Sequence, residues 1–255
     1  MFTDTHSHIH FREFPDREAV LKRAIEANVM AQILVGCTVA DSLDALHFVR
    51  KHPDCQLFST LGVHPDNADE FTEDVRGRFE KLAKNEKKIV ALGEIGLDYF
   101  RNLKPHSLQQ SAFRAQLALA LELDLPVIVH IRDAWDDAYK ILDDAGNRRV
   151  ILHCFTGHME QAQYALGKGY YLSFSGVLTY PKNEYLRAIS ALAPETQILL
   201  ETDCPYLAPQ TYRGQRNEPA YLVETAKVLA QARGISLEEI AKLTTANAMR
   251  VFSLQ

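Results

Sequence analysis

The sequence predicts an α/β fold, a single (β/α)8 TIM barrel with an additional C-terminal helix. Short apolar runs alternate with amphipathic helical stretches from one end of the chain to the other. The runs are continuously apolar, as strands buried on both faces of a parallel sheet require. A length of 255 residues, an apolar fraction of 47% and an even composition favour one domain over residues 1–255. A doubly wound open sheet is the alternative, but no Gly-x-Gly-x-x-Gly sequence opens a helix after a predicted strand.

Eight strands are expected in the apolar runs. They cover residues 1–8, 33–36, 56–63, 89–92, 126–130, 149–153, 170–174 and 197–203. The stretches that separate them carry apolar side chains at helical spacing, at residues 17–28, 39–51, 71–85, 107–123, 134–144, 160–167 and 183–192. A loop over residues 204–216 then precedes two helices, at 219–232 and 237–252. Ser236 and Glu239 form a capping box for the last helix.

Bulk properties exclude several classes of protein. No apolar run is long enough to cross a membrane, and no signal peptide precedes the first strand, so we expect a cytosolic protein that does not bind membranes. The four cysteines lack Cys-x-x-Cys spacing, which argues against a zinc finger or a disulfide framework. The net charge of -5 disfavours a broad basic surface for nucleic acid. It still allows an enzyme that binds a few phosphates through metal ions and local arginines.

Histidines and carboxylates stand at the ends of six of the eight predicted strands. Alternate side chains of a strand share a face, so His6 and His8 project together from the first strand. The others are His64, Glu94, His130, His153 and Asp203. In a parallel barrel these ends meet at one rim, where active sites lie. A lone His-x-His is most simply a pair of solvated histidines, but this number of strand-end ligands favours a metal site.

The donor set suggests two divalent ions, because it exceeds what one catalytic zinc needs. One ion would take His6, His8, Glu94 and Asp203. The second would take Glu94, His130 and His153, with Glu94 as the bridge. Nitrogen and oxygen ligands together suit Zn, Mn, Fe or Co, whereas Mg, also a candidate, prefers mostly oxygen. Two such ions, about 3.5–4 Å apart, would activate a water and stabilise an in-line displacement.

The segments around these residues carry a family resemblance. They are Asp4-Thr5-His6-Ser7-His8, Gly62-Val63-His64-Pro65, Gly93-Glu94-Ile95-Gly96-Leu97-Asp98-Tyr99, Val129-His130-Ile131-Arg132-Asp133-Ala134, Leu152-His153-Cys154-Phe155-Thr156-Gly157 and Glu201-Thr202-Asp203-Cys204-Pro205-Tyr206-Leu207. In this order the sequence resembles the TatD family of metal-dependent deoxyribonucleases, over essentially the whole chain. The resemblance implies a TIM barrel of the amidohydrolase-like superfamily. It also implies metal-dependent hydrolysis of DNA, typically from the 3′ end of single strands.

Carried over by residue, the resemblance supports six metal ligands: His6, His8, Glu94, His130, His153 and Asp203. The sequence departs from the family pattern at two places. His10 stands where the family often has Asp, and Cys204 stands where it often has Ser after the metal-binding Asp. We expect His10 to be an exposed histidine, with a contact to a metal ligand as the alternative.

Catalytic roles are expected for three of these strand-end residues. Asp203 would orient or deprotonate the metal-activated water, Glu94 would bridge the ions, and His64 would bind a phosphate oxygen or protonate the leaving 3′ oxygen. Plain packing is an equal expectation for His64, and a purely structural ligand is the alternative for Asp203. Glu201, two residues before Asp203, would support the site by pairing with a ligand histidine or an arginine.

Substrate contacts are expected from arginines and aromatic rings near the ligands. Arg213 and Arg132 would each clamp a phosphate, although an ion pair with Asp133, Asp136 or Asp137 is an equal expectation for Arg132. A terminal base would stack on an aromatic ring, with core packing as the simpler alternative. The candidate rings are Tyr99, Phe155 and Tyr206.

Two other functions compete with the nuclease. The first is ester or amide hydrolysis on the same metal site, as in a cyclic amidohydrolase, a lactonase or an aminoacyl-tRNA deacylase. Binuclear sites of the first two kinds often resemble ones bridged by a carboxylated lysine, whereas Glu94 ends the fourth strand here. The second is a barrel that keeps metal for stability only. We expect DNA ends, or RNA ends, as substrate, and a monomer without an obligate protein partner.

Overall fold

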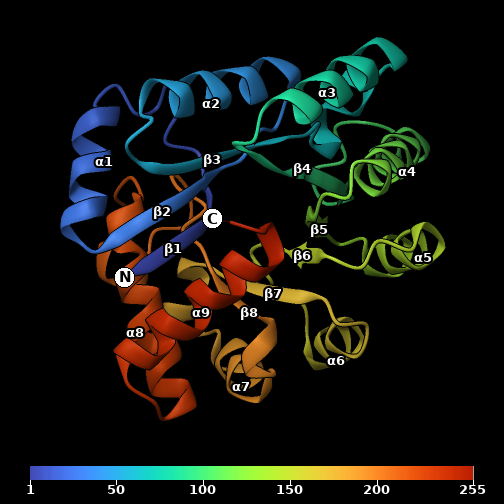
Figure 1. Cartoon of the computed structure of the whole chain (residues 1–255). Helices are drawn as coiled ribbons and strands as arrows, with labels where there is room; N and C mark the ends of the chain where they lie inside the picture. The colour runs from blue at the N-terminus through green and yellow to red at the C-terminus, as the bar shows by residue number, and fades with distance from the viewer. Residues whose placement is uncertain (255) are drawn as a thin grey trace. The chain divides into compact units, whose positions relative to one another are not determined.

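A computed structural model gives the structure of the chain and describes residues 1–254 (Figure 1). Eight strands form one sheet in the order β1 to β8, and the described strand pairs are parallel. The strands are β1 Phe2–Ser7, β2 Val29–Leu34, β3 Gln56–Leu61, β4 Ile89–Asp98, β5 Val127–Arg132, β6 Val150–Leu152, β7 Tyr171–Phe174 and β8 Ile198–Leu200. This sequential parallel order is that of a (β/α)8 barrel, as predicted.

An α-helix follows each strand, and one more ends the chain. The helices are α1 Arg17–Glu26, α2 Val39–Lys51, α3 Glu73–Asn85, α4 His106–Glu122, α5 Trp135–Ala145, α6 Met159–Gly167, α7 Glu184–Leu192, α8 Leu222–Arg233 and α9 Leu237–Phe252. The predicted additional C-terminal helix is therefore confirmed. Its capping box is present, because Ser236 Oγ accepts from the Glu239 amide and Glu239 accepts from the Ser236 amide.

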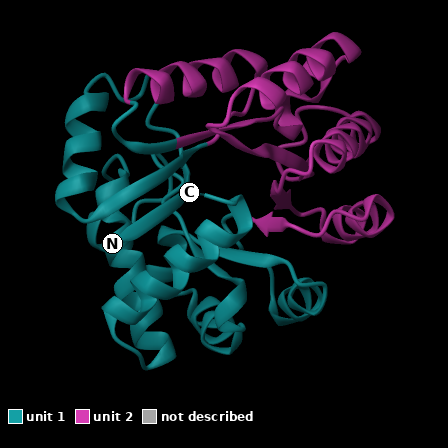
Figure 2. Ribbon diagram, viewed as in Figure 1, with its two compact units in different colours: residues 1–34, 53–57, 153–255 teal, residues 35–52, 58–152 magenta. Residues whose placement is uncertain are grey.

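The chain divides into two compact units, each built from separate stretches of sequence (Figure 2). Unit 1 comprises Met1–Leu34, Pro53–Leu57 and His153–Gln255. Unit 2 comprises Val35–His52 and Phe58–Leu152. The expectation of one domain over residues 1–255 stays a prediction.

Two strand ends differ from the prediction in ways that matter for the polar residues. β4 continues to Asp98, because Asp98 pairs with Arg132 of β5, and Glu94 therefore lies inside the strand. β8 stops at Leu200, and Asp203 lies beyond it with φ of 57°. The Asp203 amide donates to the carbonyl of His6 at 2.9 Å. The expectation of a regular strand through Asp203 is thus wrong, because this hydrogen bond to β1 takes the backbone out of extended geometry.

A 3-10 turn, Pro65–Glu70, lies between β3 and α3 and was not predicted. His64 caps it, with Nδ1 accepting from the Asp66 amide at 3.1 Å. Thr72 then caps α3 by accepting from the Val75 amide, so α3 begins at Glu73 rather than at residue 71. The signals in the sequence were Pro65 at the first position of the turn and a threonine before an acidic pair.

The last helix, α9, covers the N-terminal ends of two strands of unit 1. Thr245 Oγ1 donates to the carbonyl of Met1 at 3.2 Å, and Asn247 Nδ2 donates to the carbonyl of Ile198 at 2.8 Å. These bonds satisfy backbone acceptors that precede β1 and start β8. At the C-terminal ends of the same strands lie the polar residues His6, His8 and Asp203.

In unit 2, β4 and β5 approach so closely that Gly96 has no room for a side chain. A Cβ at Gly96 would lie 2.0 Å from the carbonyl oxygen of His130, and its φ of 142° is one that L-residues rarely adopt. Phe113 and Leu117 of α4 are buried in the same unit. The close approach therefore sets the position of the His130 backbone.

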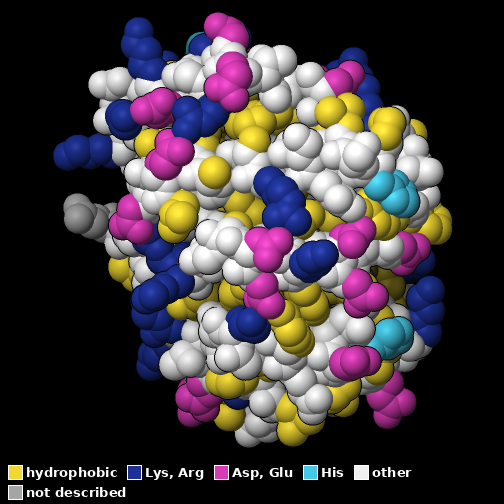
Figure 3. Space-filling view, turned by 90° about the vertical axis from the view of Figure 1, so that its right-hand side faces the viewer, with side chains coloured by type: hydrophobic (Ala, Val, Ile, Leu, Met, Phe, Trp, Pro, Cys, Tyr) yellow, Lys and Arg dark blue, Asp and Glu magenta, His cyan; other side chains and the backbone are white. Residues whose placement is uncertain are grey.

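The surface bears both signs of charge. Figure 3 shows Lys and Arg side chains intermixed with Asp and Glu over the face it presents, in keeping with the net charge of -5. Within residues 1–254, no helix combines the length and apolar character that a membrane span needs.

Candidate metal centre

In unit 1, two histidines of β1 and one aspartate converge. His6 and His8 lie 3.1 Å apart at their Nε2 atoms, as alternate residues on one face of a strand. Asp203 Oδ1 lies 3.7 Å from His6 Nε2 and 3.5 Å from His8 Nε2. All three residues are buried. Burial alone would raise the pKa of Asp203, but the hydrogen bond from His8 and the nearby His6 and His153 outweigh it and lower that pKa.

His153 joins this group from the end of β6. Its ring stacks on that of His6 with 4.1 Å between centroids, and its Nδ1 lies 3.3 Å from Glu201 Oε1. The fully buried Glu201 also accepts from the Cys154 amide at 2.7 Å. A carboxylate at one ring nitrogen sets the tautomer and orientation of a histidine, as partners of metal ligands do. Burial raises the pKa of the Cys154 thiol to about 12, so that cysteine stays protonated.

In unit 2, Glu94 lies between two histidines. Its Oε1 is 2.8 Å from His130 Nδ1 and 3.5 Å from His64 Nε2, and Glu94 is 4% exposed. His64 was expected to contact substrate and was not expected among the metal ligands. The structure brings it together with Glu94 and His130 in a group that could hold a metal ion.

Sequence reasoning gave no role to Asp98 or Asp66, although both lie beside the histidines of unit 2. Asp98 Oδ2 is 3.2 Å from His130 Nε2 and Asp66 Oδ2 is 3.5 Å from His64 Nδ1. Burial would raise the pKa of Asp98, but the bonds from His130 and the Arg101 amide lower it overall. For Asp66, burial prevails over the attraction of Arg101 and raises the pKa. The available signal for Asp98 was its place in the segment that contains Glu94.

Asp4 was not predicted from the sequence either. It connects β1 to the segment that follows β8. It is fully buried, and burial raises its pKa to about 7 despite the bonds it accepts. Those bonds come from the Thr202 amide at 3.0 Å, the Thr202 hydroxyl at 2.5 Å and the His6 amide at 3.2 Å. Asp4 thereby positions the backbone on both sides of the group formed by His6 and Asp203.

The spacing of the ligand atoms fits a cation. A tetrahedral ion with bonds of about 2.0–2.1 Å separates its ligand atoms by about 3.3 Å. The Nε2 and Oδ1 atoms of His6, His8 and Asp203 are 3.1 to 3.7 Å apart. In unit 2 the two distances from Glu94 Oε1 are 2.8 and 3.5 Å. Buried imidazoles and carboxylates at this spacing suit a divalent metal of borderline softness.

The expected exposure of His10 is wrong, because this residue is 1% exposed. The Phe11 amide donates to the carbonyl of His8, so the chain turns after β1 and carries His10 inward. Its ring packs edge-on against Phe11, 4.9 Å between centroids, and lies 6.0 Å from the ring of His8. Cys204, the other departure from the family pattern, is buried as well.

Both arginines that were expected to clamp phosphate lie over aromatic rings. The guanidinium of Arg132 is 3.9 Å from the ring centroid of Phe100, and that of Arg213 is 4.1 Å from the ring centroid of Tyr180. Arg132 forms no described ion pair with Asp133, Asp136 or Asp137 within residues 1–254. The guanidinium of each arginine therefore stacks on an aromatic ring.

The three aromatic candidates for base stacking differ in exposure. Tyr99 stacks on His106 with 3.5 Å between centroids and donates its hydroxyl to Asp137 at 2.7 Å. Phe155 is 1% exposed, so its ring is packed in the core and offers no face to a base. Tyr206 is 51% exposed.

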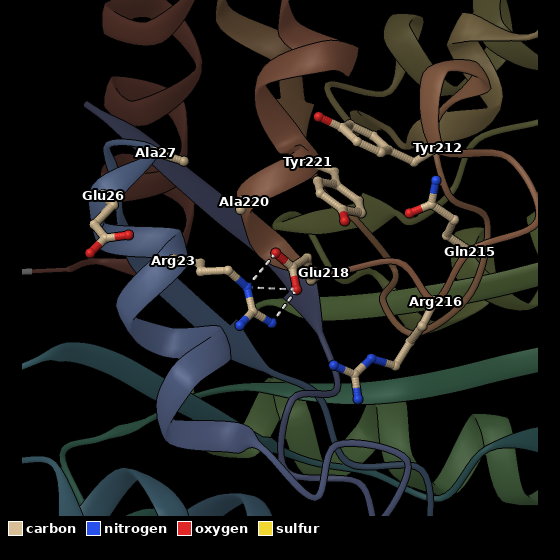
Figure 4. A pocket seen from close by; sticks show the side chains of 9 residues that line it. All are labelled: Arg23, Glu26, Ala27, Tyr212, Gln215, Arg216, Glu218, Ala220 and Tyr221. Atoms are coloured by element: carbon tan, nitrogen blue, oxygen red, sulfur yellow. Dashed lines mark hydrogen bonds and ion pairs between the residues drawn. The ribbon is translucent and has the colours of Figure 1, made fainter.

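An open pocket of about 740 Å³ lies beside the loop that follows Asp203 (Figure 4). Arg23 of α1 and Glu218 point toward one another across its wall, with Arg23 Nη2 donating to Glu218 Oε2 at 2.6 Å and Nε donating to Oε1 at 2.9 Å. Tyr212 and Tyr221 stack at 3.7 Å between centroids. The loop is thus tied to α1 by an ion pair whose carboxylate is buried.

Replacing Arg23 with alanine should lower the free energy of unfolding by about 1–3 kcal/mol, because the buried Glu218 loses its donors. Urea denaturation measures the change. Lys22→Ala is the matched control, since Lys22 pairs with Glu26 at the exposed surface and such pairs contribute about 0.2–1 kcal/mol. Equal effects of the two substitutions would contradict a structural role for the buried pair.

Comparison with known proteins gives a consistent result. The family model described as TatD related DNase matches residues 3–253. The chain is 37% identical to the "Uncharacterized metal-dependent hydrolase YabD" of Bacillus subtilis, with all of both chains covered, and 38% identical to the "3'-5' ssDNA/RNA exonuclease TatD" of Erwinia tasmaniensis, with 94% of each covered. Among solved structures, the TatD homologue YJJV of Escherichia coli superposes with a TM-score of 0.93 at 31% identity, covering 100% of this chain and 98% of that one.

Proposed function

Because the chain belongs to the family of TatD related DNases, we propose that it is a metal-dependent nuclease that removes nucleotides from the 3′ end of single-stranded DNA, and of RNA. The observation that carries this proposal is the pair of ligand groups, the buried His6–His8–Asp203 and the largely buried His64–Glu94–His130. The residues of each group lie in the C-terminal halves of parallel strands or just after them, the side on which barrel enzymes bind substrate. Relatives named as 3′–5′ exonucleases and as a metal-dependent hydrolase support the same reaction class.

We propose six ligands for two divalent ions, Mn, Zn or Mg among them: His6, His8, Glu94, His130, His153 and Asp203. The distances within each unit add His64 as a candidate ligand beside Glu94 and His130. When bound, such ions act as Lewis acids toward phosphate oxygens and lower the pKa of a coordinated water. Sharing of Glu94 between the ions, a cytosolic location and a monomeric state stay predictions.

Side chains of the protein would assist the attack of water on the phosphorus and the departure of the 3′ oxygen. Asp203, held ionised by neighbouring histidines, accepts a proton from the attacking water. Glu201 would favour one orientation of His153, because its Oε1 lies 3.3 Å from the Nδ1 of that ring. His64 would hydrogen-bond the leaving 3′ oxygen if it is not a ligand. The water's oxygen forms the new bond to phosphorus and the bond to the 3′ oxygen breaks. The 3′ oxygen of the shortened strand takes a proton from His64 or from solvent, and a nucleoside 5′-monophosphate is released.

The test uses single-stranded oligonucleotides labelled at the 3′ or the 5′ end, incubated with EDTA, Mg²⁺, Mn²⁺ or Zn²⁺. We expect metal-dependent shortening that releases the 3′ label first. Loss of the 5′ label first would reverse the proposed polarity. If elemental analysis shows that the protein contains metal and the oligonucleotides are still not cleaved, ester or amide hydrolysis at the same ligands would be favoured.

Arg213→Ala is expected to raise KM for the oligonucleotide about tenfold and to leave kcat within about twofold, because a charged hydrogen bond to phosphate is lost in substrate and transition state alike. Steady-state kinetics measure both constants. The control is Arg148→Ala, an exposed arginine on the loop that precedes β6. An unchanged KM for the Arg213 variant would refute the phosphate clamp.

A further inference from the structure

The loop after β4 presents an aromatic ring to solvent. Phe100 is 62% exposed, and the guanidinium of Arg132 lies over one face of its ring at 3.9 Å from the centroid. A single exposed apolar side chain is ordinary on a protein surface. The combination with a stacked cation is what singles out this ring, because it forms a flat surface with a positive charge on one side.

Backbone bonds hold Phe100 close to the ligand group of unit 2. The Tyr99 amide donates to the carbonyl of Arg132 at 2.9 Å, and the Arg101 amide donates to Asp98 Oδ1 at 2.7 Å. Asp98 is the same residue that contacts His130 Nε2. The loop is therefore fixed on both sides of Phe100 by residues that also position a candidate metal ligand.

Sequence separation gives the distance scale. Arg132 is two residues from the candidate ligand His130, and Phe100 is two residues from Asp98, which contacts His130. The two Cα atoms of each such pair lie within about 7 Å of one another. A further tie comes from Arg101, whose guanidinium lies 3.1 Å from Asp66 Oδ2. The exposed ring is thus close to the ligand group of unit 2, near enough for a nucleotide bound at that group to place a neighbouring base against it.

The neighbouring ring of Tyr99 is already engaged. It stacks on His106, its hydroxyl donates to Asp137, and Gln110 donates to the hydroxyl at 2.8 Å. Phe100 has its ring in solvent instead. Of the two adjacent aromatic residues, Phe100 is the one whose surface a ligand can use.

We propose that Phe100 and Arg132 form a stacking surface for one nucleobase of the single-stranded substrate, close to the nucleotide being removed; this inference rests on the proposed function. A base stacks on the ring, while Arg132 adds attraction for the adjacent phosphate. Every base has a flat π face, so the surface binds without sequence preference. A base inside a duplex is already stacked on its neighbours, so the surface also favours single strands.

The test locates the base by removing it. A series of oligonucleotides carries one abasic residue at successive positions from the 3′ end, and KM is measured for the wild type and for Phe100→Ala. We expect one abasic position to raise the wild-type KM at least about fivefold. Phe100→Ala should raise KM for the intact oligonucleotide by a similar factor and should be insensitive to the abasic residue at that position.

Two further variants control for the shape of the loop. Phe100→Trp keeps a flat ring and should retain the wild-type KM and abasic profile. Leu103→Ala removes another exposed apolar side chain, 57% exposed, from the same loop and should leave both unchanged. An abasic profile in Phe100→Ala identical to that of the wild type overturns the inference.

A binding measurement separates this inference from the proposed function. Fluorescence anisotropy records the Kd for a labelled oligonucleotide with phosphorothioate linkages at its 3′ end, in the presence of Mn²⁺. Cleavage is measured in parallel on the same oligonucleotide without phosphorothioate linkages. Weaker binding by Phe100→Ala, together with no cleavage of the unmodified strand by the wild type, would uphold the stacking surface and refute the nuclease. Cleavage by the wild type with equal Kd for both proteins would uphold the nuclease and refute the stacking surface. No binding by the wild type would refute both.

Discussion

Replacing Glu94 with alanine is expected to lower kcat for oligonucleotide cleavage by more than about 100-fold, because even the partners of metal ligands contribute about 10- to 100-fold. Glu94 is the carboxylate that faces both His64 and His130 in unit 2. Its loss removes the negative charge that would balance a cation there. Steady-state kinetics with saturating Mn²⁺ measure kcat, and elemental analysis measures the metal content.

The matched variant is Glu94→Gln, which keeps the volume of the side chain and removes its charge. It should lose activity as fully as Glu94→Ala, whereas a loss caused by a cavity would appear in the alanine variant alone. Glu73→Ala, at an exposed position on α3, should keep the wild-type rate. Wild-type turnover by Glu94→Gln would remove Glu94 from the catalytic centre.

Replacing Gly96 with alanine is expected to lower the free energy of unfolding by about 2–5 kcal/mol, the sum of backbone strain and overpacking. The new methyl group would lie 2.0 Å from the carbonyl oxygen of His130 at a φ of 142°. To accept it, β5 must move away from β4 and take His130 with it. Urea denaturation measures the stability, and kcat should fall with it in the folded variant.

Gly77→Ala is the control for Gly96→Ala. Gly77 is an exposed residue inside α3, and an added Cβ there meets nothing within 4 Å. Alanine favours a helix over glycine, so this variant should gain about 0.5–1 kcal/mol. A loss of stability at Gly77, or none at Gly96, would contradict the importance of the close approach between β4 and β5.

The fold was predictable because hydrophobic burial repeats so regularly along this chain. Continuous apolar runs such as Val127-Ile128-Val129 leave few alternatives to a buried parallel strand. Strand ends were less predictable, because tertiary hydrogen bonds decide them. β8 stops at Leu200, and beyond it the Asp203 amide donates to the carbonyl of His6. No local sequence pattern predicts this hydrogen bond.

The ligand groups were largely predictable, whereas their surroundings were not. His6 and His8 share a face by the geometry of a strand alone. His10 lies two positions further and was expected to be exposed, but the turn after β1 buries it. The roles of Asp98 and Asp4 depend on contacts with residues distant in sequence, such as Thr202, which lies 198 positions after Asp4. Local spacing carries no information about such contacts.

The bonds between Asp4 and Thr202 have a consequence for the order in which the enzyme becomes active. Protein synthesis delivers His6 and His8 before Asp203, and Asp4 cannot bind Thr202 until residue 202 has left the ribosome. The same holds for Thr245, which donates to the carbonyl of Met1. A chain whose synthesis has not yet passed residue 202, or one truncated before residue 202, therefore lacks the group of His6, His8 and Asp203.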